Sequence, residues 1–105
     1  MAVATDLNPG TSPVMSLRLA MALACAQFRL TPAEALRGST VHAARALGIA
    51  GAGVLRVGAR SDVVLWRVRE PAELSYWLGG DLAQTVVANG NVISGAWPDA
   101  PKRPL

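Results

Sequence analysis

Residues 2–13 read AVATDLNPGTSP, an apolar run followed by a polar, turn-rich segment. Residues 2–5 form a short apolar run with a β-branched centre, which is typical of the end of a strand. Asp6 closes the run, and Pro9-Gly10 is a strong turn signal within a loop over residues 7–12. Helix signals follow the loop. The order of strand, polar loop and helix predicts a βα unit.

Asp6 allows two interpretations. An aspartate at the carboxyl end of a strand, before a loop and a helix, lies where (β/α)8 barrels keep catalytic groups. The alternative is an aspartate that only stabilises the turn before Asn8, Pro9 and Gly10. The local pattern taken alone favours the turn.

Residues 13–48 predict a block of helices. For the first helix, Thr11 or Ser12 can serve as N-cap, and Pro13 fits the first turn. The run over residues 14–28 is apolar almost all the way round, and a helix without a polar face is buried or covered by other structure. We therefore expect neighbours on more than one side of this helix.

Two shorter helices are expected next. Thr31 as N-cap, Pro32 as first helical residue and Glu34 three residues after the cap predict a capping box. Gly38 is expected to end this helix, and a third helix, STVHAARALG, is closed by Gly48.

The pattern changes from helices to strands near residue 50. Residues 63–68 predict a strand from their β-branched and aromatic content. A helical turn is expected over residues 71–77, and Asn89-Gly90 predicts a hairpin with a type I′ turn. The proline-rich tail over residues 97–105 is expected to be extended or disordered. Helices therefore precede strands, which predicts two layers.

The composition leaves two explanations open. Hydrophobic residues make up 51% of the 105 residues and charged residues only 16%. Because a small domain exposes a large share of its surface, such apolar content suggests faces covered by absent polypeptide. Alternatively, the many alanines inflate the apolar count. Two or three strands also need further strands or a partner layer to be stable.

Charge and cysteine content argue against several classes of function. The net charge is +3 and the pI is about 10.0, but the basic residues form no stripe, so nucleic-acid binding is not predicted. The apolar run over residues 19–26 is far shorter than the roughly 20 residues that span a bilayer, so no membrane partner is expected. Cys25 is a lone cysteine and is expected to be a buried, inert thiol. No signal peptide is evident, and a cytoplasmic location is expected.

Four stretches, in order, carry a family resemblance: ATDLNPGTSP, TPAEALRGSTVHAARALG, GVLRVGARSDVVLW and PAELSYWLGG. From about Val3 to Ile93 the chain resembles the C-terminal quarter of imidazolonepropionase, a metal-dependent hydrolase of histidine degradation in the amidohydrolase superfamily. The middle stretches resemble many amidohydrolases, whereas the first and last are typical of this branch. Ser61 is a departure, because the superfamily usually has alanine before this aspartate.

The resemblance implies an α/β fold that is part of a larger one. Residues 1–50 would be the last strand and helices of a (β/α)8 barrel, with residues 2–6 as its eighth strand. Residues 51–96 would supply the C-terminal strands of a small β-sandwich built from both chain ends, and residues 97–105 a tail.

The resemblance also implies a reaction. Imidazolonepropionases hydrolyse a C–N bond of 4-imidazolone-5-propanoate to give N-formimidoyl-L-glutamate, with one Zn²⁺ or Fe³⁺ that activates water. Asp6 matches the metal-binding aspartate of the last strand, which can also accept the proton of that water. Asn8, Gly10 and Thr11 match substrate-contacting positions.

Each of these three residues has a physical reason to contact the substrate. Asn8 can offer an amide to the polar edge of the ring. Gly10 lets the backbone approach closely. Thr11 is expected at a helix N-terminus, which favours the substrate's carboxylate.

The remaining metal ligands of the resembled family have no match here. His42 is the single histidine, and we expect it to be a helix-surface or packing residue. One carboxylate cannot hold a catalytic zinc, which takes three protein ligands or more. The chain is therefore expected to bind no metal and to be inactive by itself, and whether it is an enzyme stays open.

Three alternatives also stay open. The chain could be a half-enzyme that completes a barrel with a second polypeptide carrying the missing N-terminal part. It could be a non-catalytic interaction or oligomerisation module that pairs with copies of itself. It could also belong to another hydrolase branch, such as a cyclic amidase or deaminase.

Overall fold

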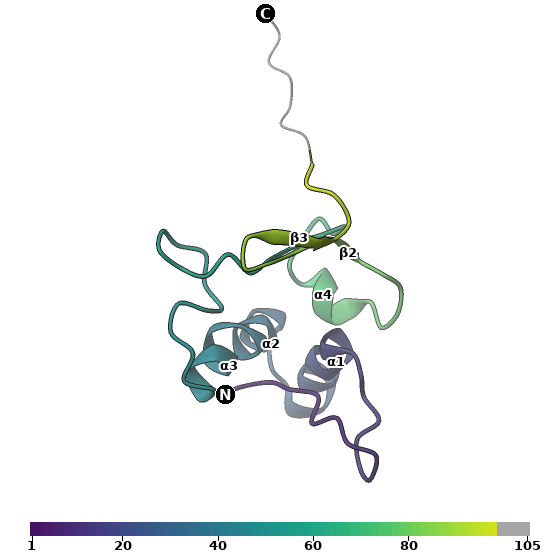
Figure 1. Cartoon of the computed structure of the whole chain (residues 1–105). Helices are drawn as coiled ribbons and strands as arrows, with labels where there is room; N and C mark the ends of the chain where they lie inside the picture. The colour runs from purple at the N-terminus through teal and green to yellow at the C-terminus, as the bar shows by residue number, and fades with distance from the viewer. Residues whose placement is uncertain (99–105) are drawn as a thin grey trace, which may run out of the picture.

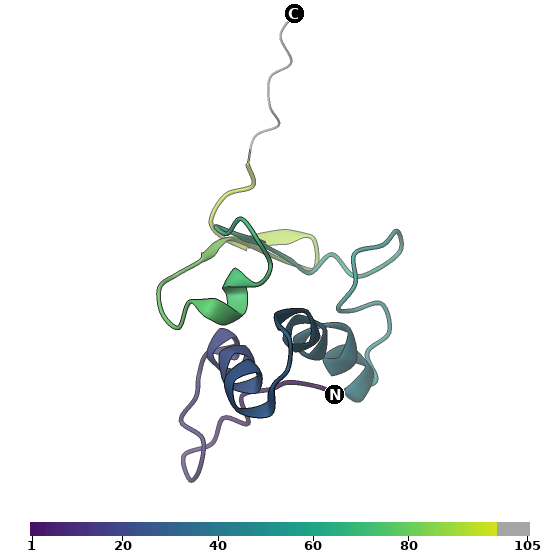
Figure 2. The same ribbon diagram turned by 180° about the vertical axis from the view of Figure 1, so that it is seen from behind.

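The computed structural model describes residues 1–98, which form a layer of helices packed on one side of an antiparallel sheet (Figure 1). The helical layer contains α1 (Leu17–Phe28), α2 (Pro32–Ser39) and α3 (Val41–Ala46). The sheet has the order β1 (Val63–Trp66), β2 (Ala83–Ala88) and β3 (Asn91–Ser94), and α4 (Glu73–Tyr76) lies between the sheet and α1. The view from behind shows the same two layers (Figure 2).

Within the described residues, no helix is both long and apolar enough to span a bilayer. Most of the predicted tail, residues 99–105, lies outside the described residues.

The beginning of the chain differs from the sequence-based prediction. Residues 2–5 run extended, but no strand is formed there, because no neighbouring strand is present to pair with them in the described chain. The first helix also begins later than predicted. Its N-cap is Ser16, whose side chain accepts a hydrogen bond from the Leu19 N–H at 3.3 Å. Thr11 and Ser12 are therefore not the cap.

The capping box of the second helix is confirmed. The Thr31 hydroxyl oxygen accepts from the Glu34 N–H at 3.2 Å, and the Glu34 carboxylate accepts from the Thr31 N–H at 2.8 Å. The helix continues one residue past Gly38, which is buried within it. Gly48 follows α3 with a φ of +69°, so the predicted glycine closure is confirmed.

The sheet is a meander whose hairpin matches its prediction. Asn89 and Gly90 connect β2 to β3 with φ values of +49° and +78°, the left-handed pair that a type I′ turn requires. Two residues that precede β1 bind this turn. The Asp62 carboxylate accepts from the Asn89 N–H at 2.8 Å, and the Ser61 carbonyl accepts from the Gly90 N–H at 3.0 Å. The predicted strand over residues 63–68 is shorter, because β1 ends at Trp66 after an irregularity in its pairing with β2.

The core is built mainly from small residues. Its buried members are Val3, Ala20, Met21, Ala24, Ala35 and Leu74, with Cys25, Leu30, Leu36, Trp66 and Val68 partly buried against them. Larger apolar side chains are exposed over much of the described chain, including Leu17, Phe28, Leu55, Val57, Tyr76, Leu78, Ile93 and Trp97. Both explanations of the composition thus have a basis, because alanine fills the core and large apolar side chains lie outside it. Cys25 is only partly buried, so its predicted full burial is not reached.

The motif PAELSYWLGG forms α4 and the loop that follows it. The Glu73 carboxylate accepts from the backbone N–H groups of Arg69 (2.7 Å) and Glu70 (2.9 Å) and from the Trp77 indole N–H (3.3 Å). From α1, the Arg18 guanidinium donates to the carbonyl oxygens of residues 77, 79 and 80 at 2.9, 3.3 and 2.6 Å. Glu73 therefore holds the backbone just before α4, and Arg18 holds the backbone just after it.

Stability at acidic pH should depend on Glu73. The backbone N–H groups of Glu70 and Arg69, and then the Trp77 indole, hold the pKa of Glu73 below its ordinary value of about 4.5. This stabilisation is present above that value and is lost as the pH falls through the lowered pKa, because the unfolded state takes up the proton first.

Urea unfolding of the wild-type chain and Glu73→Gln between pH 3 and 7 tests this prediction. The wild type should lose more stability on acidification than Glu73→Gln. Glu70→Gln removes the same charge beside the motif and should keep the wild-type dependence. Equal pH profiles for the wild type and Glu73→Gln would contradict the prediction.

Candidate functional site

The loop after residues 2–5 is closed by hydrogen bonds from within. Asn8 and Ser12 form an isolated antiparallel bridge, in which the Asn8 N–H donates to the Ser12 carbonyl at 2.9 Å. The Asn8 side-chain oxygen accepts from the N–H groups of Gly10 (2.9 Å) and Thr11 (2.8 Å) and from the Thr11 hydroxyl (3.2 Å). Asparagine commonly organises a turn in this way.

Asp6 lies at the start of this loop in an unusual backbone conformation. Its φ is +50°, in the left-handed region, which aspartate and asparagine tolerate better than most residues. Hydrogen bonds hold the carbonyl on each side of its Cα. The Ser12 hydroxyl donates to the Thr5 carbonyl at 2.7 Å, and the Asn8 side-chain amide donates to the Asp6 carbonyl at 2.8 Å.

The Asp6 carboxylate is free to bind a ligand. Asp6 is exposed, and within residues 1–98 no hydrogen bond or ion pair engages its side-chain oxygens. Carboxylate oxygen is a common ligand for zinc and iron. Asp6 therefore fits a metal ion as one ligand of a set.

The other ligands of such a set are not found nearby. The described part of the chain contains no group of three or more His, Cys, Asp and Glu side chains that could hold a metal ion. His42 lies on α3 and is half-buried, which agrees with a packing role. Partial desolvation, and then the positive charges of the N-terminus, Arg37 and Arg45, lower the pKa of His42 below 6.5.

The expectation for Thr11 needs a correction. Thr11 was expected at a helix N-terminus, where free N–H groups attract an anion, but α1 begins six residues later at Leu17. The N–H groups of Gly10 and Thr11 instead donate to Asn8. The Thr11 hydroxyl likewise donates to the Asn8 side-chain oxygen, so Thr11 is part of the loop and not of a helix. Asn8, however, keeps one side-chain N–H beyond the one that it donates to the Asp6 carbonyl.

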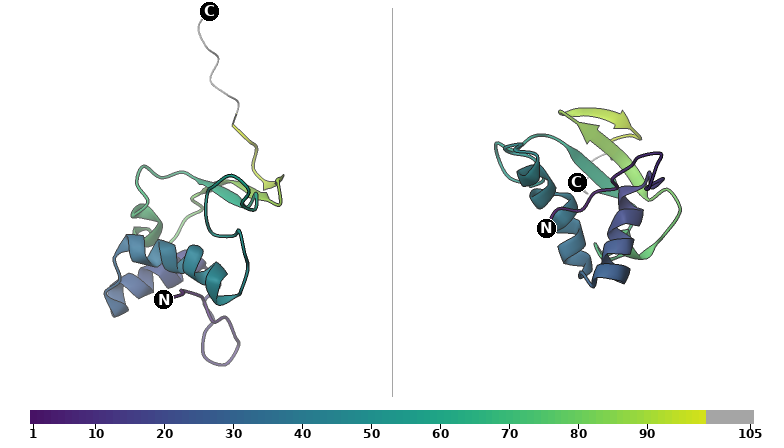
Figure 3. Two further views of the ribbon diagram at one scale, coloured as in Figure 1. Left: turned by 90° about the vertical axis from the view of Figure 1, so that its left-hand side faces the viewer. Right: turned by 90° about the horizontal axis from the view of Figure 1, so that it is seen from below.

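The segment that leads to Asp6 lies on the outer face of the helical layer, away from the sheet (Figure 3). The Val3 N–H donates to the Gly38 carbonyl at 2.8 Å, and the Val3 side chain is buried. A Cβ on Gly38 would lie 2.7 Å from Val3 Cγ2 and 3.0 Å from the Met1 carbonyl oxygen. Gly38 therefore permits the close approach of this segment to α2.

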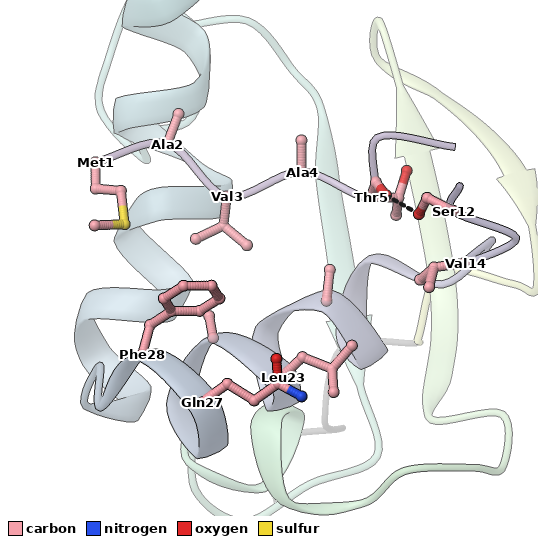
Figure 4. A pocket seen from close by; sticks show the side chains of 12 residues that line it. Met1, Ala2, Val3, Ala4, Thr5, Ser12, Val14, Leu23, Gln27 and Phe28 are labelled. Carbon is pink, nitrogen blue, oxygen red and sulfur yellow. Dashed lines mark hydrogen bonds between the residues drawn. The ribbon is translucent and has the colours of Figure 1, made fainter. Parts of the chain in front are cut away.

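A groove of about 290 Å³ separates residues 1–5 from α1, and the close-up shows Phe28, Gln27 and Leu23 lining its α1 side (Figure 4). Ser12 and Val14 close the end nearest the loop. Apolar side chains thus remain accessible beside the segment that presents Asp6.

Sequence reasoning missed two residues that shape this site. Ser12 was considered only as a helix cap, and Gly38 only as a helix end. The signal for Ser12 was its place in the first motif, six residues after Asp6. No local signal could show that Gly38 contacts Val3, because the contact joins segments far apart in the sequence.

A family model described as the amidohydrolase family matches residues 1–93. Among curated proteins, the imidazolonepropionases of Pseudomonas paraeruginosa (strain DSM 24068 / PA7) and Pseudomonas aeruginosa (strain UCBPP-PA14) are each 57% identical to this chain over 94 residues. That match covers 89% of this chain and 23% of each relative. The imidazolonepropionase of Pseudomonas fluorescens (strain Pf0-1) is 57% identical over 90 residues, 85% of this chain and 22% of its own. The chain thus spans less than a quarter of the length of these curated relatives.

Replacing Gly38 by alanine should detach the N-terminal segment. Alanine adds up to about 1 kcal/mol of helix propensity, but the overlap with Val3 and Met1 should cost about 1–3 kcal/mol. We expect a net loss of stability in urea unfolding and faster amide exchange at Val3. Gly79→Ala is the matched control, because its Cβ would meet nothing within 4 Å. A more stable Gly38→Ala chain with unchanged Val3 exchange would refute the close approach.

Proposed function

Because this chain belongs to the amidohydrolase family, we propose that it is the part of an imidazolonepropionase-like hydrolase that carries Asp6, and that it acts only together with further polypeptide. The observation that carries the proposal is 57% identity to imidazolonepropionases over 89% of the chain. The free, exposed carboxylate of Asp6 at the start of an ordered loop supports it. The substrate would be 4-imidazolone-5-propanoate, opened at a C–N bond to N-formimidoyl-L-glutamate.

In the complete enzyme, residues 1–50 would form the last strand and helices of a (β/α)8 barrel. The extended segment 2–6 would pair there with neighbouring strands. Residues 51–96 would join a β-sandwich, with residues 97–105 as a tail. Two features support this arrangement: apolar side chains are accessible beside the segment, and β1 and β3 are both edges of a three-stranded sheet.

Each site residue has a proposed task. The Asp6 carboxylate would be one ligand of the metal ion, and one of its oxygens would accept a proton during the attack of water. A bound Zn²⁺ or iron ion would supply the acidity that activates this water at neutral pH. Asn8 would orient the ring with its remaining side-chain N–H, Gly10 would allow close approach of the substrate, and the Thr11 hydroxyl would contact it.

The missing ligands define the partner. A catalytic zinc takes three protein ligands or more, so the others must come from polypeptide that supplies histidines. The partner in this proposal is therefore the N-terminal part of the barrel, in the same or in a second chain. The alternative is an interaction module that associates with copies of itself through its exposed apolar residues.

A chimera separates these functions. The matching C-terminal portion of the Pseudomonas aeruginosa imidazolonepropionase is replaced by this chain, and hydrolysis of 4-imidazolone-5-propanoate is measured in the presence of Zn²⁺ or iron. We expect an active chimera. An inactive, well-folded chimera would refute the enzymatic proposal, and self-association of the isolated chain would then favour the interaction module.

Asp6→Asn in the chimera tests the role of the carboxylate. Asparagine also tolerates a positive φ, so the loop should keep its shape while one charge is lost. We expect kcat to fall roughly 10²–10⁴-fold, the usual range for a general base. Asp81→Asn is the matched control, because asparagine retains the oxygen that accepts from the Ala83 N–H. Equal activity of Asp6→Asn and Asp81→Asn would exclude Asp6 from catalysis.

A further inference from the structure

The hydroxyl of Ser12 has a partner that no helix-capping role explains. It donates to the Thr5 carbonyl at 2.7 Å, the usual length of a good O–H···O hydrogen bond (Figure 4). Ser16 caps α1, four residues further along the chain. The Ser12 hydroxyl is partly buried and therefore well placed to hold this bond.

The Thr5 carbonyl belongs to the peptide group that ends at the Asp6 nitrogen. A hydrogen bond to this carbonyl fixes the orientation of that peptide group, which is one of the two sides between which the φ of Asp6 is defined. The Ser12 carbonyl also accepts from the Asn8 N–H at 2.9 Å. Ser12 therefore joins both sides of the loop, once through its side chain and once through its backbone.

Asp6 needs such support because its conformation is unfavourable. A left-handed backbone costs a non-glycine residue about 1 kcal/mol or more, and such a conformation persists only where the surroundings determine it. The Asn8 side-chain amide binds the carbonyl of Asp6, which follows its Cα. The Ser12 hydroxyl binds the carbonyl of Thr5, which precedes it.

From this geometry we infer that Ser12 is a positioning residue that orients the Asp6 carboxylate for a metal ion through the Thr5 carbonyl. The inference rests on the proposed function for the metal, but its structural half stands on the hydrogen bond alone. In this proposal Ser12 does not contact the metal ion or the substrate. Its effect on a ligand passes entirely through the direction in which Asp6 points.

The first test is nuclear magnetic resonance of the full 105-residue chain. The one-bond Cα–Hα coupling of Asp6 reports whether its φ is positive. We expect the wild type and Ser12→Thr, which keeps a hydroxyl, to retain a positive φ at Asp6. Ser12→Ala and Ser12→Val should lose it, while Ser94→Ala, the same truncation in β3, should have no effect. The Asn89 and Gly90 amide signals verify that each variant remains folded.

Two results would overturn the structural half. One is an unchanged Asp6 coupling in a folded Ser12→Ala chain. The other is loss of the positive φ in Ser12→Thr as well, which would show that the shape of Ser12 matters and its hydroxyl does not. Because Thr and Val have the same shape, a difference between these two variants isolates the hydrogen bond.

The second test uses the chimera and separates this inference from the proposed function. Zn²⁺ affinity, measured by competition with a chelator, should fall about 10–100-fold in Ser12→Ala and recover in Ser12→Thr. We expect kcat to fall with it and KM to change little. Unchanged Zn²⁺ affinity in Ser12→Ala would overturn the inference even if the chimera is active. If the wild-type chimera neither binds Zn²⁺ nor turns over substrate, the proposed function fails. The one-bond Cα–Hα coupling of Asp6 then still decides whether Ser12 determines the φ of Asp6.

Discussion

The burial of Leu74 joins the two layers of the structure. Leu74 is only 5% exposed and lies in the same core as Met21 of α1 and Ala35 of α2. Trp66 of β1 and Val68 pack against this core from the side of the sheet. Because the rest of the core is mostly alanine, the few larger side chains around Leu74 contribute much of the apolar area that holds sheet and helices together. The hydrogen bonds of Glu73 and Arg18 fix the short helix that carries it.

The elements that the sequence predicted best are those whose determinants lie within a few residues. The capping box at Thr31 and Glu34 and the turn at Asn89-Gly90 each depend on side chains and φ values inside one turn of chain. Such features depend little on distant parts of the chain, so pattern and structure agree. The strand at residues 63–66 was also found, although its C-terminal end depended on pairing with β2.

The predictions that failed depended on which partner a polar group would choose. Thr11 and Ser12 have the residue types of a helix cap, but their hydroxyls bind Asn8 and the Thr5 carbonyl instead. The extended segment before Asp6 has the composition of a strand, yet strand formation needs a neighbour that local sequence cannot provide. For the candidate site, the motif around Asp6 pointed to the residues, whereas the hydrogen bonds that shape the loop required coordinates. The catalytic roles of Asp6, Asn8, Gly10 and Thr11 stay predictions.

The spacing of these contacts along the chain has a consequence for folding kinetics. The helix α2 and the β2–β3 hairpin are closed by contacts between near neighbours, and such elements form in microseconds in isolation. Leu74 lies 53 positions after Met21 of α1 and 39 positions after Ala35 of α2, so bringing them together costs loop-closure entropy. We therefore expect docking of α4 to limit the folding rate, and the loop around Asp6, which is closed within seven residues, to order independently of that step.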